Sequence, residues 1–151
     1  MSMLSLRTIR LLVVDDNPGF VYLLRRAFGD RAGRIRWDLT VAEDGEAALK
    51  MLFREEVGSA PLPDLILLDW NLPKLSGSDV LEQVKQHRRL RKIPVLVFTS
   101  SEDERDVHTA YDSHANAYIT KPETSVALLA IVEAIERFWI AVAQLPGSSV
   151  K

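Results

Sequence analysis

Short apolar runs alternate with amphipathic segments along the whole chain, and this alternation predicts five pairs of a strand and a helix. The runs are rich in Val, Ile, Leu and aromatic residues, as expected for parallel strands that are covered on both faces. The order is typical of a doubly wound α/β domain with right-handed crossovers. We expect strands near residues 9–14, 35–41, 64–69, 93–98 and 116–120, and helices near residues 18–29, 44–54, 76–90, 102–114 and 123–143.

Three carboxylates interrupt this pattern at the ends of two apolar runs. Asp15 and Asp16 follow residues 11–14, and Asp69 follows residues 65–68. Because the carboxyl ends of parallel strands meet at one edge, these charges should lie close together. At about 4 Å and an effective dielectric of about 20, each pair repels by about 4 kcal/mol. The cluster must therefore be hydrated, protonated or bound to a divalent metal.

Magnesium is the metal that such a cluster suits, because it prefers hard oxygen ligands and commonly shares its shell with a phosphate. Ligands of open α/β sheets bind outside the carboxyl ends of the strands, and four further polar residues are expected there. An acid can attack phosphorus, while a hydroxyl and an ammonium bind the phosphoryl oxygens. These four residues are Asn71, Thr99, Ser100 and Lys121. The pattern therefore predicts phosphoryl chemistry at an aspartate.

Composition limits the function classes. A chain of 151 residues with 47% hydrophobic and 26% charged residues fits one domain. The net charge of −2 argues against nucleic acid as a partner, and we interpret the basic residues 87–92 as the last turn of a helix. The absence of cysteine excludes disulfides, thiol catalysis and zinc-thiolate sites. Without a signal peptide or an apolar span of about 18 residues, we expect a cytoplasmic protein that has no membrane partner.

The chain resembles the receiver domain of two-component response regulators over residues 9–142, which leaves a short arm and tail in a single domain spanning residues 1–151. Asp15 and Asp16 match that family's metal-binding pair. Asp69, within residues 67–73, matches the phosphoacceptor and a metal ligand. The backbone carbonyl of Asn71 matches the third protein ligand of Mg²⁺, which we expect Mn²⁺ to replace readily.

Later positions match as well. Thr99 matches the switch hydroxyl that moves toward the phosphoryl group, and Tyr118 matches the switch aromatic. Lys121 matches the lysine that pairs with phosphoryl oxygens, and the resemblance implies a cis bond before Pro122 that aims its ammonium into the site. Ser100 and Pro122 are expected to be auxiliary residues of the same site. The resemblance further implies a flavodoxin-like fold with strand order 2-1-3-4-5 and five helices.

The function implied by the resemblance is signalling rather than enzymatic turnover of a separate substrate. A sensor histidine kinase would phosphorylate Asp69, and autodephosphorylation would reverse the change. The added charge would switch the surface of the fourth helix, fifth strand and fifth helix. No output domain follows within these residues, so the signal is expected to leave through a partner protein.

A narrower resemblance concerns residues 114–122, residues 15–19 and the long surface loop predicted at residues 55–63. These look like the stand-alone regulators that are paired with bacterial phytochrome-type histidine kinases. The expected last helix is apolar over more than one face, and the apolar surface that does not pack on the sheet requires a partner. The leading interpretation is a homodimer through the fourth and fifth helices, including the fifth strand between them. The alternative is coverage by the arm or by residues 144–151.

Three other functions are considered. A Mg²⁺-dependent phosphatase that forms an aspartyl phosphate would need a second acid two residues beyond its nucleophile, where this chain has Asn71 after Asp69 and Asn17 after Asp15. A flavin or nucleotide module would need a loop rich in glycine or hydroxyls after the first strand. A phosphorylation-independent interaction domain is the third, and the intact residue set counts against it. The three histidines are interpreted as structural or surface residues: His87, His108 and His114.

Overall fold

The structure is a computed structural model, and it describes residues 7–29, 35–54 and 61–146. One parallel sheet contains five strands in the order β2-β1-β3-β4-β5, as expected. These strands are β1 (Arg7–Val14), β2 (Ile35–Ala42), β3 (Leu65–Leu68), β4 (Val95–Thr99) and β5 (Ala117–Thr120). The helices in the described residues are α1 (Pro18–Gly29), α2 (Gly45–Leu52), α3 (Gly77–Gln86), α4 (Glu104–Asp112), α5 (Ser125–Ile135) and the π-helix η1 (Glu136–Val142).

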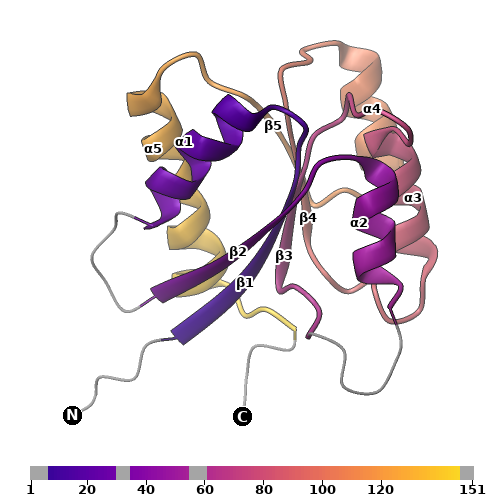
Figure 1. The fold of residues 1–151 in the computed structure, drawn as a ribbon, viewed down its shortest axis with the longest axis horizontal. Helices are drawn as coiled ribbons and strands as arrows, with labels where there is room; N and C mark the ends of the chain where they lie inside the picture. The colour runs from indigo at the N-terminus through magenta and orange to yellow at the C-terminus, as the bar shows by residue number, and fades with distance from the viewer. Residues whose placement is uncertain (1–6, 30–34, 55–60, 147–151) are drawn as a thin grey trace.

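Helices cover both faces of the sheet, with α1 and α5 on one side and α2, α3 and α4 on the other (Figure 1). Alternate strand residues supply the two cores, because successive side chains of a strand point to opposite faces. In β1, Leu12 and Val14 join the core beneath α2 and α3. Leu11 and Val13 join the core beneath α1 and α5. Two covered faces explain why the central strands are continuous apolar runs.

The end of α3 differs from the sequence expectation. The helix predicted over residues 76–90 ends at Gln86. His87 then turns the chain, because its Nδ1 accepts hydrogen bonds from the amides of Arg89 and Leu90, at 3.1 and 3.3 Å. Residues 87–92 therefore form a turn, and their interpretation as the last turn of a helix was wrong.

The last helix changes its winding. The single helix predicted over residues 123–143 continues α5 as the π-helix η1 after Ile135. This segment packs at the amino ends of the first two strands, where Ile9, Ile140 and Leu145 form a small third core. The Arg7 guanidinium donates to the Ile140 carbonyl at 3.1 Å, so contacts with β1 accompany the wider helical turn.

Some sequence expectations fall on residues that are not described. They are residues 55–60 of the predicted surface loop, residues 1–6 of the arm and residues 147–151 of the tail. Within the described ranges, no helix has the length and hydrophobicity needed to cross a membrane.

Candidate functional site

The sheet's hydrogen-bond ladder positions the candidate site at its carboxyl edge. The Asp15 amide donates to Ala42 of β2 at 3.0 Å, and the Asp69 amide donates to Val14 of β1 at 2.9 Å. The Lys121 amide donates to the Thr99 carbonyl at 2.8 Å. Each functional residue thus lies directly beyond its strand, where an adjacent strand holds its backbone.

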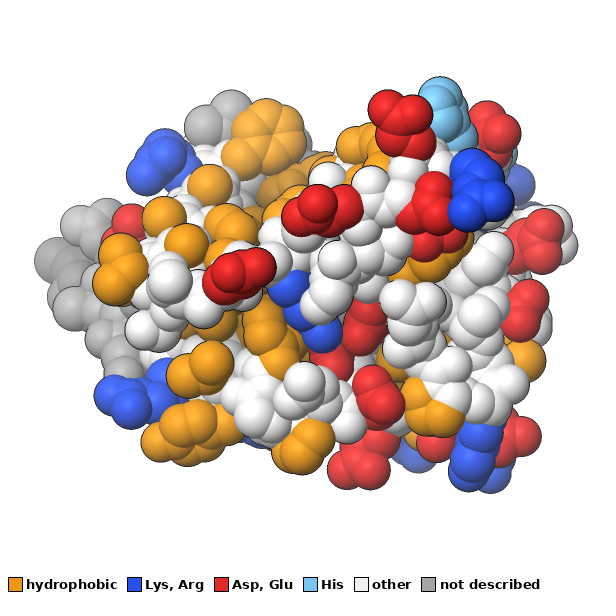
Figure 2. Space-filling view, turned by 90° about the horizontal axis from the view of Figure 1, so that it is seen from above, with side chains coloured by type: hydrophobic (Ala, Val, Ile, Leu, Met, Phe, Trp, Pro, Cys, Tyr) orange, Lys and Arg blue, Asp and Glu red, His pale blue; other side chains and the backbone are white. Residues whose placement is uncertain are grey.

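The three predicted acids meet at this edge. Asp15, Asp16 and Asp69 each offer an oxygen, and these oxygens all lie within 4.8 Å of one another. Asp15 and Asp69 are buried, whereas Asp16 is exposed. Acidic side chains surround the middle of this edge in a view from above (Figure 2). A set of three carboxylates fits a hard divalent cation, which would offset their repulsion.

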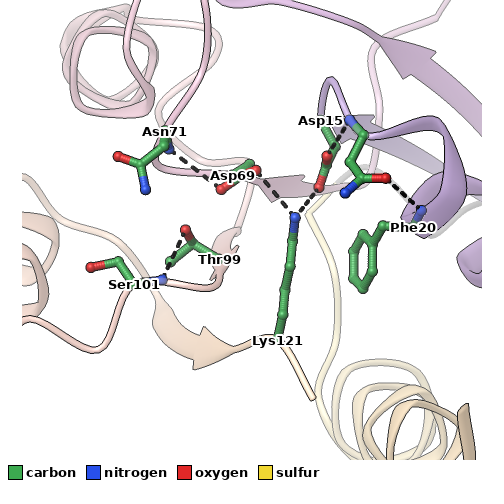
Figure 3. A network of polar contacts seen from close by, with 8 residues as sticks. Asp15, Phe20, Asp69, Asn71, Thr99, Ser101 and Lys121 are labelled. Carbon is green, nitrogen blue, oxygen red and sulfur yellow. Dashed lines mark hydrogen bonds and ion pairs between the residues drawn. The ribbon is translucent and has the colours of Figure 1, made fainter. Parts of the chain in front are cut away.

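Lys121 lies between two of these acids (Figure 3). Its Nζ is 2.9 Å from Asp15 Oδ2 and 3.2 Å from Asp69 Oδ2, and only 10% of its side chain is exposed. The peptide bond to Pro122 is trans, so the expected cis bond was wrong. The long lysine side chain brings the ammonium to the carboxylates from the trans backbone without that isomer.

Burial controls the ionisation of Asp15. Loss of water raises the pKa of its carboxyl above the ordinary value of 3.8. The hydrogen bond from Lys121 and the bond from the Asn17 amide to Asp15 Oδ1, at 2.9 Å, act in the opposite direction. The nearby Asp69 charge raises the pKa further. Asp15 is thus a buried acid whose negative charge is only partly compensated.

Asn71 and Thr99 both lie on the side of Asp69 away from Asp15 in Figure 3. The Asn71 amide donates to Asp69 Oδ1 at 3.4 Å, which places the backbone of this predicted ligand beside the acid. Thr99 is fully buried at the end of β4, and its Oγ1 accepts a 3.4 Å bond from the Ser101 amide. Ser100 between them is exposed.

Tyr118 connects β5 with the loop before α4. Its hydroxyl donates to the Ser101 carbonyl at 2.9 Å, and its amide donates to the Tyr111 hydroxyl on α4 at 3.1 Å. Burial raises the pKa of Tyr118 above 10.0, and the hydrogen bond to Ser101 opposes this. Ser101 also donates to Asp106 of α4, at 2.6 Å. The predicted switch aromatic therefore contacts both a loop beside the site and a helix.

Two residues at the site were missed in the sequence. A Cβ added to Gly77 would lie 2.4 Å from the Asp69 carbonyl and 2.7 Å from Trp70 Cα, so the loop after Asp69 requires glycine there. The ring centroid of Phe20 lies 4.3 Å from Lys121 Nζ. A glycine just after a capping serine and an aromatic residue in the first helical turn were the available signals. Neither signal indicates which residue the glycine or the aromatic ring contacts in the folded protein.

Comparisons with known proteins agree with this geometry. Residues 11–133 match the family model of the response regulator receiver domain. The probable methanogenesis regulatory protein FilR2 of Methanothrix harundinacea is 41% identical over 139 residues, which are 91% of this chain and 87% of FilR2. The crystal structure of the phosphorylated cyanobacterial phytochrome response regulator RcpA superposes with a TM-score of 0.85 at 37% identity, covering 93% of this chain and 99% of RcpA.

A second similar structure contains a metal. The Mn²⁺-bound form of response regulator Rcp1, a protein of Synechocystis, superposes with a TM-score of 0.82 at 37% identity. The similarity covers 92% of this chain and 99% of the Rcp1 chain. Divalent metal binding at the three acids of this chain is consistent with that structure.

Proposed function

The chain belongs to the response regulator receiver domain family, and from this membership we propose that Asp69 accepts a phosphoryl group from a sensor histidine kinase. The observation that carries the proposal is the meeting of three carboxylates with the Lys121 ammonium at one edge of the sheet. One acid is then a nucleophile and the ammonium a partner for the transferred oxygens, as phosphoryl transfer requires.

Asp15, Asp16, Asp69 and the Asn71 carbonyl would hold Mg²⁺, and Mn²⁺ would substitute. When bound, the metal supplies positive charge that compensates the carboxylates and the incoming phosphoryl oxygens. In the transfer, an Asp69 oxygen bonds to phosphorus as the bond from phosphorus to the donor histidine nitrogen breaks. The electron pair of that broken bond leaves with the imidazole. Such a displacement requires the Asp69 oxygen, the phosphorus and the leaving nitrogen to lie in line.

Lys121 and Thr99 respond to the new charge. Lys121 exchanges its contact with Asp69 for the phosphoryl oxygens, and the Thr99 hydroxyl donates to another of these oxygens. Tyr118 enters the space that Thr99 vacates. Its contacts with Ser101 and Tyr111 support this role, because they connect it to α4. The surface of α4, β5 and α5 then changes its preference for partners.

The proposed kinase is of the bacterial phytochrome type. The similarity to RcpA and Rcp1 over nearly their whole length supports a stand-alone regulator of this kind. We assign the signal output to a partner protein or to a homodimer through α4, β5 and α5.

The first test is incubation with Mg²⁺ and acetyl phosphate, followed by intact-mass measurement. The wild type should gain one phosphoryl group, and Asp69→Asn should gain none. Glu82→Gln, which removes an exposed carboxylate on α3, is the matched control and should behave as wild type. Equal incorporation by wild type and Asp69→Asn would exclude Asp69 as the acceptor.

The kinase assignment needs its own experiment. Radiolabelled histidine kinases of several classes would be mixed with the protein for short times, and transfer rates compared. Faster transfer from a phytochrome-type kinase supports the assignment. Uniform rates across the panel would contradict it while leaving the acceptor role of Asp69 intact.

A further inference from the structure

Phe20 presents its aromatic ring to the Lys121 ammonium (Figure 3). The distance from Lys121 Nζ to the ring centroid is 4.3 Å, which is well inside the range of about 6 Å over which a cation is attracted to an aromatic face. The ammonium therefore has three neighbours of negative potential. Two are the carboxylates of Asp15 and Asp69, and the third is an uncharged ring.

The ring itself is held in place from two directions. Phe98 of β4, which is buried, contacts it edge-on with centroids 5.3 Å apart and planes at 84°. The Phe20 amide donates to the side-chain oxygen of Asn17 at 3.0 Å, which anchors the first turn of α1. The amide bond restrains the backbone of this helical turn and the Phe98 contact packs the ring, so both contacts restrict how Phe20 can move relative to Lys121.

An aromatic ring and a carboxylate interact with the ammonium in different ways. It attracts the positive charge but accepts no strong hydrogen bond, so the N–H donors stay available for carboxylate or phosphoryl oxygens. The ring also occupies one side of the ammonium, which leaves less room there for water. With 10% of its side chain exposed, Lys121 has lost most of its hydration, and this strengthens its attraction to the ring.

We propose that Phe20 is the positioning residue for Lys121. Its π face keeps the ammonium beside Asp69 when the metal and the phosphoryl group replace the ammonium as the partner of the acids. This role rests on the proposed phosphoacceptor function of Asp69. In that state the contact with Asp15 or Asp69 weakens, whereas the contact with an uncharged ring remains. The ammonium then meets the phosphoryl oxygens from a preset position, which lowers the cost of ordering it.

The test compares variants of the full chain by their affinity for beryllofluoride at saturating Mg²⁺. Phe20→Leu keeps an apolar side chain but removes the π face, and it should weaken binding by about three- to tenfold. Phe20→Tyr keeps the face and should restore the affinity. Site-specific replacement of Phe20 by phenylalanines carrying one, two and three ring fluorines should weaken binding stepwise, since fluorine withdraws electron density at nearly constant shape.

A second readout requires neither metal nor phosphoryl analogue. In the metal-free protein, the ring current of Phe20 should shift the NMR signals of the Lys121 side-chain methylene next to Nζ upfield. Phe20→Leu should abolish the shift, and Phe20→Tyr should retain it. Fluorination of Phe28 is the matched control: this residue lies on the same helix, contacts Trp37 at 4.6 Å between centroids, and should change neither readout.

The outcomes separate this role from the proposed function. A wild type that binds no beryllofluoride would overturn Asp69 as acceptor and with it the role of Phe20. A wild type that binds normally, with every Phe20 variant binding equally well, would overturn the role of Phe20 alone. Weak binding by Phe20→Leu together with a flat fluorine series would assign the residue to packing and would also overturn the proposal.

Discussion

Asp15 is a carboxylate that is withdrawn from water and only partly compensated. Burial is the largest cause of its raised pKa, and Lys121 and the Asn17 amide oppose it. Because the folded-state pKa lies above the ordinary value of 3.8, the folded protein holds this proton more tightly than the unfolded chain. The stability contributed by this group is therefore complete below about pH 4 and is lost as pH rises through the folded pKa.

Asp15→Asn removes the titration. In the metal-free wild type, deprotonation of Asp15 should lower the unfolding free energy as pH rises above 3.8. We expect metal-free Asp15→Asn to lack this part of the decline. Urea unfolding at a series of pH values in the presence of a chelator measures the difference in slope. Glu82→Gln serves as the control carboxylate. A wild-type slope in Asp15→Asn would show that burial of Asp15 does not affect the pH dependence.

Gly77 allows the loop after Asp69 to approach α3 closely. In Gly77→Ala the new methyl group would meet backbone atoms of Asp69 and Trp70, which cannot move as easily as a side chain. We expect a loss of stability of about 1–3 kcal/mol from this overpacking, together with slower phosphorylation. Gly29→Ala is the matched control, since a Cβ there has no neighbour within 4 Å. Equal stability of the two variants in urea would contradict the prediction.

At the scale of elements, Lys85 connects α3 with three other segments at the amino edge of the sheet. Its Nζ donates to the carbonyls of Arg91 and Ile93, at 3.0 and 2.8 Å, and to Asn116 Oδ1 at 3.2 Å. Asn116 Oδ1 also accepts from the Val95 amide at 2.8 Å. Burial lowers the pKa of Lys85 below 10.5. One ammonium thus connects α3, the turn after it and the segments that begin β4 and β5.

Lys85→Met keeps much of the apolar chain but removes all three donors. We expect a loss of about 1–3 kcal/mol in unfolding free energy, because acceptors that are partly shielded from water become unsatisfied. Denaturant unfolding measures the loss. Lys50→Met removes an exposed lysine of α2 and should leave stability nearly unchanged. If both variants unfold at the same urea concentration, the Lys85 contacts are not stabilising.

The fifth helix shows how an element depends on its surroundings. Its apolar pattern predicts one helix, but the winding widens at Glu136. There the Trp37 indole of β2 donates to Glu136 Oε2 at 2.8 Å. Helical periodicity indicates that a segment is helical, but a contact with residue 37 is invisible in a local pattern. The π-helix could therefore not be predicted.

For the whole molecule, hydrophobic side chains remain exposed on α5 and η1. Val126 is 80% exposed, Leu129 40% and Phe138 52%. Figure 2 shows hydrophobic side chains gathered on the side where α1 and α5 lie, whereas acids surround the site. An apolar surface of this kind is typical of a protein interface.

Replacement of two of these residues tests the homodimer. We expect the wild type to form dimers, and Val126→Lys combined with Leu129→Lys to be monomeric, since charge opposes burial of this surface. Light scattering coupled to size exclusion measures the mass, with and without beryllofluoride. Gln83→Lys, on the exposed surface of α3 and outside the proposed interface, is the control. A monomeric wild type in every condition would contradict the dimer.

The amino-acid sequence by itself determined the alternation of elements and the place of the acids at strand ends, because periodicity and strand termination are local properties. Strand order was expected only from the family resemblance, and the structure agrees. The convergence of Asp15, Asp16, Asp69 and Lys121 followed from parallel strands sharing an edge, while their chemical roles stay predictions.

Only the tertiary structure decided the contacts between distant segments. The contacts of Phe20 with Lys121 and of the π-helix with Trp37 join residues far apart in the chain, and Gly77 meets Asp69 across the loop between them. The trans bond at Pro122 and the turn at His87 likewise differed from expectation. The contacts between distant segments depend on packing of one element against another, and packing energies are summed over neighbours that a linear pattern does not specify.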